Sequence, residues 1–152
     1  TQNKVGTVGC RLHFEDNTIQ HDGIELIVTP KKQLHVTHSN IKSYYSFTPR
    51  IKEVVGSTAA LLMIGVNTFK LCGGFNEKYI NCFEDVELNL RCITMGFKNY
   101  YDGSLVAYHY ESQTRNEDSE NISKLQLDFK ERLFPYIQTN ERKLTQYFNF
   151  IK

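Results

Sequence analysis

Two adjacent carboxylates, Glu84 and Asp85, are the side chains whose type and position most clearly allow chemistry. They precede an apolar segment, and a carboxylate fixed at the start of a helix is suited to accept a proton from a bound group. Upstream, Gly73 and Gly74 let the backbone turn sharply or let a ligand approach closely. The alternative is a purely structural role, in which Asp85 caps the helix and Glu84 is solvated.

The element that would position these carboxylates is a helix over residues 86–95. Its apolar side chains fall on two stripes, so we expect it to be mostly buried. Glu87 and Arg91 are four residues apart on its polar face and able to pair. Asp85 is a good N-cap residue and Gly96 is a good stop signal, so we expect a rigid first turn.

Composition sets broad limits on the class of protein. The chain has 152 residues, of which 40% are hydrophobic and 23% charged, and its net charge is +1. This balance is ordinary for a soluble protein and gives no reason to expect a nucleic acid as partner. The four cysteines, Cys10, Cys72, Cys82 and Cys92, include no Cys-x-x-Cys pair. We therefore expect reduced thiols, not a zinc site or a disulfide framework.

Strand-like and helix-like segments alternate, which favours an α/β fold. The most apolar segment, residues 54–66, predicts one strand buried on both faces in the middle of a sheet. The other expected elements are strands over 5–12, 18–28 and 34–36, a long surface loop over 37–52, a strand near 100–110 broken by a turn at Asp102-Gly103, and two helices, over 122–133 with a stop at Pro135 and over 141–151.

Six short motifs follow one another over about residues 5 to 115. They are Val5-Gly6-x-Val8-Gly9 with Arg11-Leu12, Asp16-Asn17-x-Ile19-Gln20-His21-x-Gly23, Gly73-Gly74-Phe75-Asn76-Glu77, Glu84-Asp85-Val86-Glu87-Leu88-x-Leu90-Arg91, Gly96-Phe97-Lys98, and His109-x-Glu111-Ser112-x-x-Arg115. In this order they resemble the C-terminal half of a family 2 glycosyltransferase of the bacterial polysaccharide and O-antigen type. One such motif is a weak signal, but six of them in the family's order are a strong one.

The resemblance implies the acceptor-side, C-terminal part of a mixed-sheet domain of the GT-A type (nucleotide-diphospho-sugar transferase) over residues 1–116, followed by a C-terminal helical segment over residues 117–152. It also implies inverting transfer of a sugar from a nucleotide-diphospho-sugar to a glycan or lipid-linked acceptor in cell-surface polysaccharide synthesis. The second acid of the pair is the usual base in this family, which assigns that role to Asp85. Glu84 would orient the acceptor or Asp85.

Further site residues follow from the same resemblance. Gly73 and Gly74 would contact the acceptor. His109 is similar to the family's late metal ligand, so a divalent cation, Mn²⁺ or Mg²⁺, is implied as cofactor, with its other ligands outside this chain. Ser112 and Arg115 would contact the diphosphate. Without the resemblance, a lone histidine after an apolar strand is more often structural.

One part of the family pattern is missing from this chain. Family members carry an earlier nucleotide-binding half with an Asp-x-Asp metal motif, whereas the acidic pairs here, Glu15-Asp16 and Glu117-Asp118, stand in the wrong context. We therefore expect an inactive fragment of a larger enzyme, whose exposed strand edges either favour self-association or are covered by the C-terminal helices. The expected location is cytoplasmic, with the full enzyme either free or peripheral at the cytoplasmic face of the membrane.

A competing hypothesis from another class is a non-catalytic carbohydrate-binding or assembly module. Its 10 Phe and 9 Tyr would then stack on sugar rings. This hypothesis assigns no special role to Asp85 or His109. His21 has no role implied by the resemblance, and we expect it to be a structural histidine.

Overall fold

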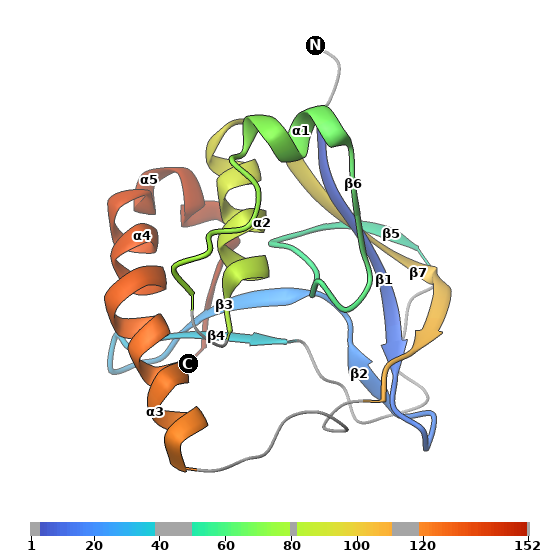
Figure 1. Cartoon of the computed structure of the whole chain (residues 1–152), viewed down its shortest axis with the longest axis horizontal. Coiled ribbons are helices and arrows are strands. Elements are labelled where there is room, and N and C mark those ends of the chain that lie inside the picture. The colour runs from blue at the N-terminus through green and yellow to red at the C-terminus, as the bar shows by residue number, and fades with distance from the viewer. Residues whose placement is uncertain (1–3, 39–49, 80–81, 111–118, 152) are drawn as a thin grey trace.

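The computed structural model describes residues 4–38, 50–79, 82–110 and 119–151. Two sheets and a set of helices make up this part of the chain (Figure 1). The fold is mixed α/β, as predicted, with a curled mixed sheet and C-terminal helices. No helix among the described residues is long and apolar enough to span a lipid bilayer.

The larger sheet is built around two long parallel strands, β1 (Val5–His13) and β7 (Lys98–Tyr108). Its strand order is β2-β1-β7-β5, with β6 also pairing with β1. The three shorter strands, all antiparallel to their neighbours, are β2 (Ile19–His21), β5 (Ile51–Val54) and β6 (Leu62–Ile64). Because β1 and β7 run in the same direction, their carboxyl ends lie at one edge of the sheet.

The smaller sheet has the order β4-β3-β8. It contains the hairpin of β3 (Ile24–Val28) and β4 (Leu34–His38), and the C-terminal strand β8 (Phe148–Phe150), which runs parallel to β3. Between β7 and β8 the chain forms α3 (Ser119–Asp128), a π-helical segment (Phe129–Leu133), α4 (Phe134–Thr139), α5 (Glu141–Leu144) and a 3₁₀ turn (Thr145–Tyr147).

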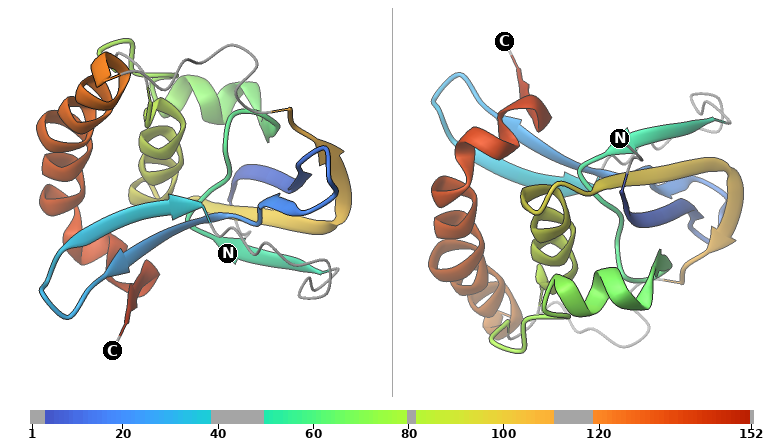
Figure 2. Two further views of the ribbon diagram at one scale, coloured as in Figure 1. Left: turned by 90° about the horizontal axis from the view of Figure 1, so that it is seen from below. Right: turned by 90° about the horizontal axis from the view of Figure 1, so that it is seen from above.

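Two helices belong to the middle of the chain, α1 (Val66–Leu71) and α2 (Glu84–Thr94). Helix α2 lies between the C-terminal helices and the larger sheet in all three ribbon views (Figures 1 and 2). Its buried Val86, Leu90 and Ile93 join one core with residues of β3 and with Leu133, Ile137 and Leu144 of the C-terminal segment. The helix is therefore mostly buried, as predicted. The expected boundary between residues 116 and 117 falls outside the described residues.

The predicted single strand over residues 54–66 is wrong. Strand β5 ends at Val54 and β6 begins at Leu62, and the residues between them form a loop. Hydrophobic composition cannot reveal this break, because buried side chains from other elements hold the loop in place. The predicted loop over 37–52 falls mostly on residues that are not described.

The C-terminal helices also differ from the prediction. Pro135 does not end the helix, since α4 continues to Thr139. Pro135 lies in the first turn of α4, directly after the π-helical segment, and proline is tolerated in the first turn of a helix because its missing N–H is not needed there. The predicted helix over 141–151 ends at Leu144. Phe148 and Phe150, two residues apart, instead pair with Leu26 and Val28 in the smaller sheet.

The predicted turn at Asp102-Gly103 is an irregularity within one continuous strand. Strand β7 runs from Lys98 to Tyr108, and its pairing with β1 shifts register between Cys10, opposite Asp102, and Arg11, opposite Val106. Such a bulge bends a strand without ending it.

All four cysteines are free thiols. Cys72 and Cys92 are buried, and their sulfur atoms lie 3.5 Å apart. Burial raises the pKa of the Cys92 thiol to about 12, so it stays protonated at neutral pH.

Candidate active site at the start of helix α2

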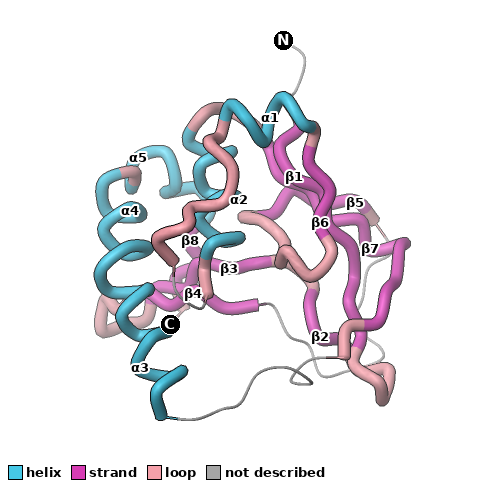
Figure 3. Tube along the Cα trace, viewed as in Figure 1, coloured by secondary structure: helices cyan, strands magenta, loops and turns pink. Residues whose placement is uncertain are grey.

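The loop between β5 and β6 (residues 55–61) passes the first turn of α2 (Figure 3). Five consecutive residues of this loop are hydrogen-bonded to other elements. The bonds are Asn99 Nδ2 to Val55 O at 2.7 Å, Ile24 N to Gly56 O at 2.8 Å, Asn89 Nδ2 to Ser57 O at 2.9 Å, Thr58 N to His21 Nε2 at 3.3 Å, and Ala59 N to Asp85 Oδ2 at 2.8 Å. Residues 55–59 are therefore held rigidly against α2.

Asp85 was predicted to be the N-cap of α2, and this is wrong: it is the second residue of the helix. Each carboxylate oxygen accepts one backbone N–H: Oδ2 from Ala59 at 2.8 Å and Oδ1 from Val86 at 2.7 Å. Because each oxygen has two lone pairs, the fixed carboxylate can still accept a proton from a bound group.

The residue before the two carboxylates has an unusual backbone conformation. Phe83 is the N-cap of α2 and has φ of 76°, in the left-handed region that bulky residues rarely adopt. Its ring packs against Phe129 at a centroid distance of 5.9 Å, which helps to hold this conformation. Strain of this kind is concentrated at functional sites.

Two buried asparagines, Asn89 and Asn99, organise the site, and neither was predicted from the sequence. Asn89 Nδ2 donates to Ser57 O and, at 2.8 Å, to Asp85 O, while its Oδ1 accepts the Thr7 hydroxyl at 2.5 Å. Asn99 Nδ2 donates to Asn89 O at 2.9 Å as well as to the loop. Neither side chain is exposed to solvent at all. The signal that could have found Asn89 is a polar residue on the apolar face of a predicted buried helix.

Two glycines allow this close packing. A Cβ atom on Gly56 would lie 2.2 Å from Cγ of Asn89, and one on Gly9 would lie 2.0 Å from Oγ of Ser57. Neither distance is possible for non-bonded atoms, so the loop packs this closely against α2 and against strand β1 only because Gly56 and Gly9 lack side chains.

Strand β2 connects His109 to the same loop. His21, which is 2% exposed, accepts the Thr58 N–H, and this structural contact agrees with its expected role. The preceding residue, Gln20, contacts His109 twice, from Oε1 to Nδ1 at 2.9 Å and from Nε2 to the carbonyl oxygen at 3.2 Å. Thr58 and Ala59 are consecutive in the loop, and Ala59 donates to Asp85. The predicted site residues His109 and Asp85 are therefore linked through β2 and this loop.

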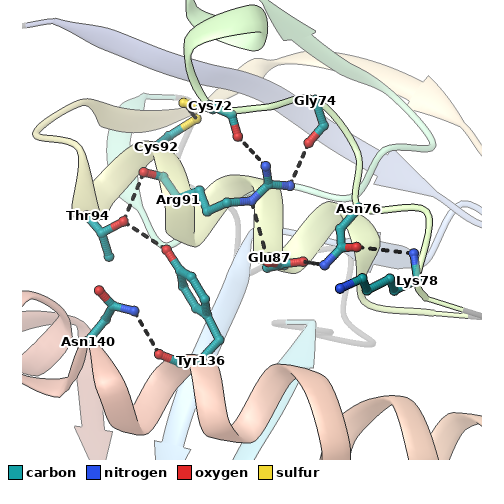
Figure 4. Close-up of polar contacts among 10 residues, drawn as sticks. All are labelled: Cys72, Gly74, Asn76, Lys78, Glu87, Arg91, Cys92, Thr94, Tyr136 and Asn140. Atoms are coloured by element: carbon teal, nitrogen blue, oxygen red, sulfur yellow. Dashed lines mark hydrogen bonds and ion pairs between the residues drawn. The ribbon is translucent and has the colours of Figure 1, made fainter.

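The Gly73-Gly74 turn lies on another face of α2. Both glycines have positive φ, 80° and 67°. Arg91 donates from Nη1 to the carbonyl of Cys72 and from Nη2 to Gly74 O at 2.5 Å (Figure 4). Arg91 lies six residues after Asp85, about 9 Å along the helix axis. The glycine pair thus contacts α2 through Arg91, and the predicted contact of the two glycines with an acceptor stays a prediction.

The predicted pairing of Glu87 and Arg91 is confirmed, with Arg91 Nε 3.6 Å from Glu87 Oε1. Asn76 Nδ2 also donates to Glu87 Oε2 at 2.8 Å, which attaches the turn to the helix (Figure 4). An open hollow of about 500 Å³ lies between the turn and this face of α2, lined by Gly73, Phe75, Asn76, Glu77, Lys78, Glu87 and Arg91.

The remaining predicted site residues are only partly visible. Glu84 is the first residue of α2 and is half-buried. Ser112 and Arg115 lie outside the described residues. Within the described part of the chain, no group of three His, Cys, Asp or Glu side chains is placed to hold a metal ion.

Comparison with known proteins gives two distant relatives. Over 119 residues the chain is 29% identical to the O-antigen biosynthesis protein RfbC of Myxococcus xanthus, a match that covers 76% of this chain and 9% of that protein. Over 117 residues it is 28% identical to the uncharacterized protein y4gI of Sinorhizobium fredii (strain NBRC 101917 / NGR234), covering 75% of this chain and 13% of that protein. The chain thus spans only about a tenth of the length of these relatives. No protein-family model and no solved structure matches it.

Proposed function

We propose that this chain is the acceptor-side portion of a GT-A type, family 2 glycosyltransferase acting in polysaccharide synthesis. The distant similarity to a protein of O-antigen biosynthesis supports this assignment. The single structural observation that carries it is the Asp85 carboxylate, fixed at the start of α2 by the Ala59 N–H at 2.8 Å. A rigid, charged carboxylate at a helix N-terminus is what a general base for hydroxyl attack requires.

In the proposed reaction, an acceptor hydroxyl oxygen attacks the anomeric carbon of a nucleotide-diphospho-sugar. The new bond joins this oxygen to the anomeric carbon, and the bond from that carbon to the diphosphate oxygen breaks with inversion. Asp85 takes the hydroxyl proton, and the nucleoside diphosphate leaves with the bonding electron pair. Glu84, the adjacent residue, orients the acceptor or Asp85.

His109 fits the role of one metal ligand in this proposal. Its Nδ1 faces the amide oxygen of Gln20, so Nε2 is the ring nitrogen available for a cation. When bound, Mn²⁺ or Mg²⁺ supplies positive charge that stabilises the leaving diphosphate. Ser112 and Arg115, which follow in the chain, are proposed to contact the same diphosphate. The other ligands come from beyond the described residues.

A non-catalytic carbohydrate-binding module is the second candidate, favoured by exposed aromatic rings. Tyr108 and Tyr110 at the end of β7 are 51% and 54% exposed, and rings of this kind can stack on sugars. The fixed carboxylate has no function in that case.

Turnover with defined donors tests the proposal. The full-length protein that contains this chain is incubated with UDP-glucose, UDP-galactose, UDP-N-acetylglucosamine, GDP-mannose and dTDP-rhamnose, with lipid-linked glycans from the source cells as acceptors. We expect acceptor-dependent release of nucleoside diphosphate from one donor and an inverted anomeric centre in the product. Binding of the glycans without turnover of any donor favours the module instead.

A further inference from the structure

We propose that Gln20 is a positioning residue that fixes the tautomer of His109 and so presents Nε2 of the ring as the atom that binds a divalent cation. This inference rests in part on the proposed function, which makes His109 a metal ligand. Gln20 is buried on β2, and its side-chain amide meets His109 at two points, the ring and the main chain.

The two contacts together settle which way the Gln20 amide points. A carbonyl oxygen can only accept a hydrogen bond, so the Gln20 atom 3.2 Å from His109 O must be the NH₂ group. The amide oxygen therefore faces Nδ1 of His109, at 2.9 Å. An amide oxygen can only accept, so Nδ1 must carry the hydrogen. In the neutral ring, Nε2 is then unprotonated and holds the free lone pair.

The main chain of His109 is fixed as well. Its N–H donates to His13 O at 2.9 Å, at the carboxyl end of the neighbouring strand β1. Together with the Gln20 contact to the carbonyl, this bond leaves the ring little freedom. A ligating histidine in proteins usually donates its other N–H to an oxygen, and loss of that partner typically weakens metal binding 10- to 100-fold. Gln20 supplies such an oxygen.

Nitrogen-15 NMR of the imidazole rings tests the inference directly, without any metal or substrate. The spectra are recorded at about pH 8, above the ordinary histidine pKa of about 6.5. We expect His109 to be protonated at Nδ1, with an unprotonated Nε2. A His109 ring protonated mainly at Nε2 overturns the proposal, whatever the function of the protein is.

Two variants separate positioning from mere packing. Gln20→Leu keeps the approximate size but removes the acceptor, so the His109 ring should become a mixture of both tautomers. Gln20→Glu keeps an oxygen acceptor and should restore the Nδ1–H form. His35, an exposed residue of β4, is the internal control and should not change. A pure Nδ1–H ring in Gln20→Leu overturns the proposal. If Gln20→Leu does not fold, the wild-type and Gln20→Glu spectra still test the proposal, because both proteins should show His109 protonated at Nδ1.

Titration with Mn²⁺ then tests the cation itself. Paramagnetic broadening of the His109 ring signals in the wild-type chain should need 10- to 100-fold less Mn²⁺ than in Gln20→Leu. Equal sensitivity in the two proteins contradicts the positioning role of Gln20. If the His109 signals are not selectively broadened in either protein, His109 does not bind the cation, and its metal role in the proposed function is wrong as well. That result leaves the proposed role of Asp85 as base untouched, because turnover of the Asp85 variant tests it.

Discussion

Asp85 and Asn89, one helical turn apart on α2, hold the same loop at two points. The Asp85 carboxylate accepts the N–H of Ala59 at 2.8 Å, and the Asn89 amide donates to the carbonyl of Ser57 at 2.9 Å. Asn89 also donates to the carbonyl of Asp85 at 2.8 Å, so one amide group contacts both the loop and the first turn of α2. The position of the carboxylate therefore depends on a buried amide and on a loop that begins 30 residues earlier in the chain.

Replacement of Asn89 should destabilise the protein strongly. Asn89→Leu preserves the approximate volume but leaves the buried Ser57 carbonyl and Thr7 hydroxyl without their partner, so we expect a loss of roughly 2–4 kcal/mol in the free energy of unfolding. Urea denaturation measures it. Gln126→Leu, at an exposed position of α3, is the matched control and should change stability by about 0.5 kcal/mol or less. Similar effects of the two substitutions would contradict the role assigned to Asn89.

The contact between β1 and the loop predicts a rescue. Gly9→Ala places a methyl group on Ser57 and should cost roughly 1–3 kcal/mol. Adding Ser57→Gly removes the opposing side chain and should recover part of that loss. Gly65→Ala is the control, because its Cβ would meet only Thr68 Oγ1, at 3.7 Å. If the double variant is no more stable than Gly9→Ala alone, the clash with Ser57 is not the cause of the lost stability.

Local pattern was enough to predict α2. Its apolar stripes, the Glu87–Arg91 pair and the stop at Gly96 all depend on residues close in sequence, and the helix observed over Glu84–Thr94 agrees with them. The start was misplaced because Asp85 resembles an N-cap in sequence, whereas the chain turns at Phe83.

The parts that could not be predicted depend on contacts between distant residues. The loop after β5 is defined by Asn89, Asn99 and His21, each from a different element, and no local pattern in residues 54–66 indicates their approach. In the same way, Phe148 and Phe150 form a strand only because β3 is present to pair with them. The Gln20–His109 contact joins residues 89 positions apart in the chain.

Metal binding by this chain alone should be weak. One imidazole does not complete a shell for Mn²⁺ or Mg²⁺, which take six ligands and prefer oxygen. Isothermal titration calorimetry should therefore show no micromolar binding of either ion without nucleotide. Micromolar affinity would mean that the ligand set is complete within these 152 residues.

Strand β6 should promote self-association. Among the described strands it pairs only with β1, and Met63 at its centre is 74% exposed. The adjoining helix α1 has no buried residue. Light scattering of the isolated chain should show mass increasing with concentration, and Met63→Lys should reduce the effect more than Leu125→Lys on α3. A monomer at all concentrations, with every strand equally protected in hydrogen exchange, would count against this prediction.

The most direct test of the proposed function compares two variants of the full-length protein under donor turnover. Asp85→Asn can accept only one of the two N–H groups that the carboxylate now binds, so it should lose about 1–2 kcal/mol of stability and still fold. Lacking a base, it should lower kcat by roughly 10²- to 10⁴-fold and leave the donor KM nearly unchanged. Glu84→Gln should cost less. Wild-type kcat in folded Asp85→Asn protein would contradict the assignment of Asp85 as the catalytic base.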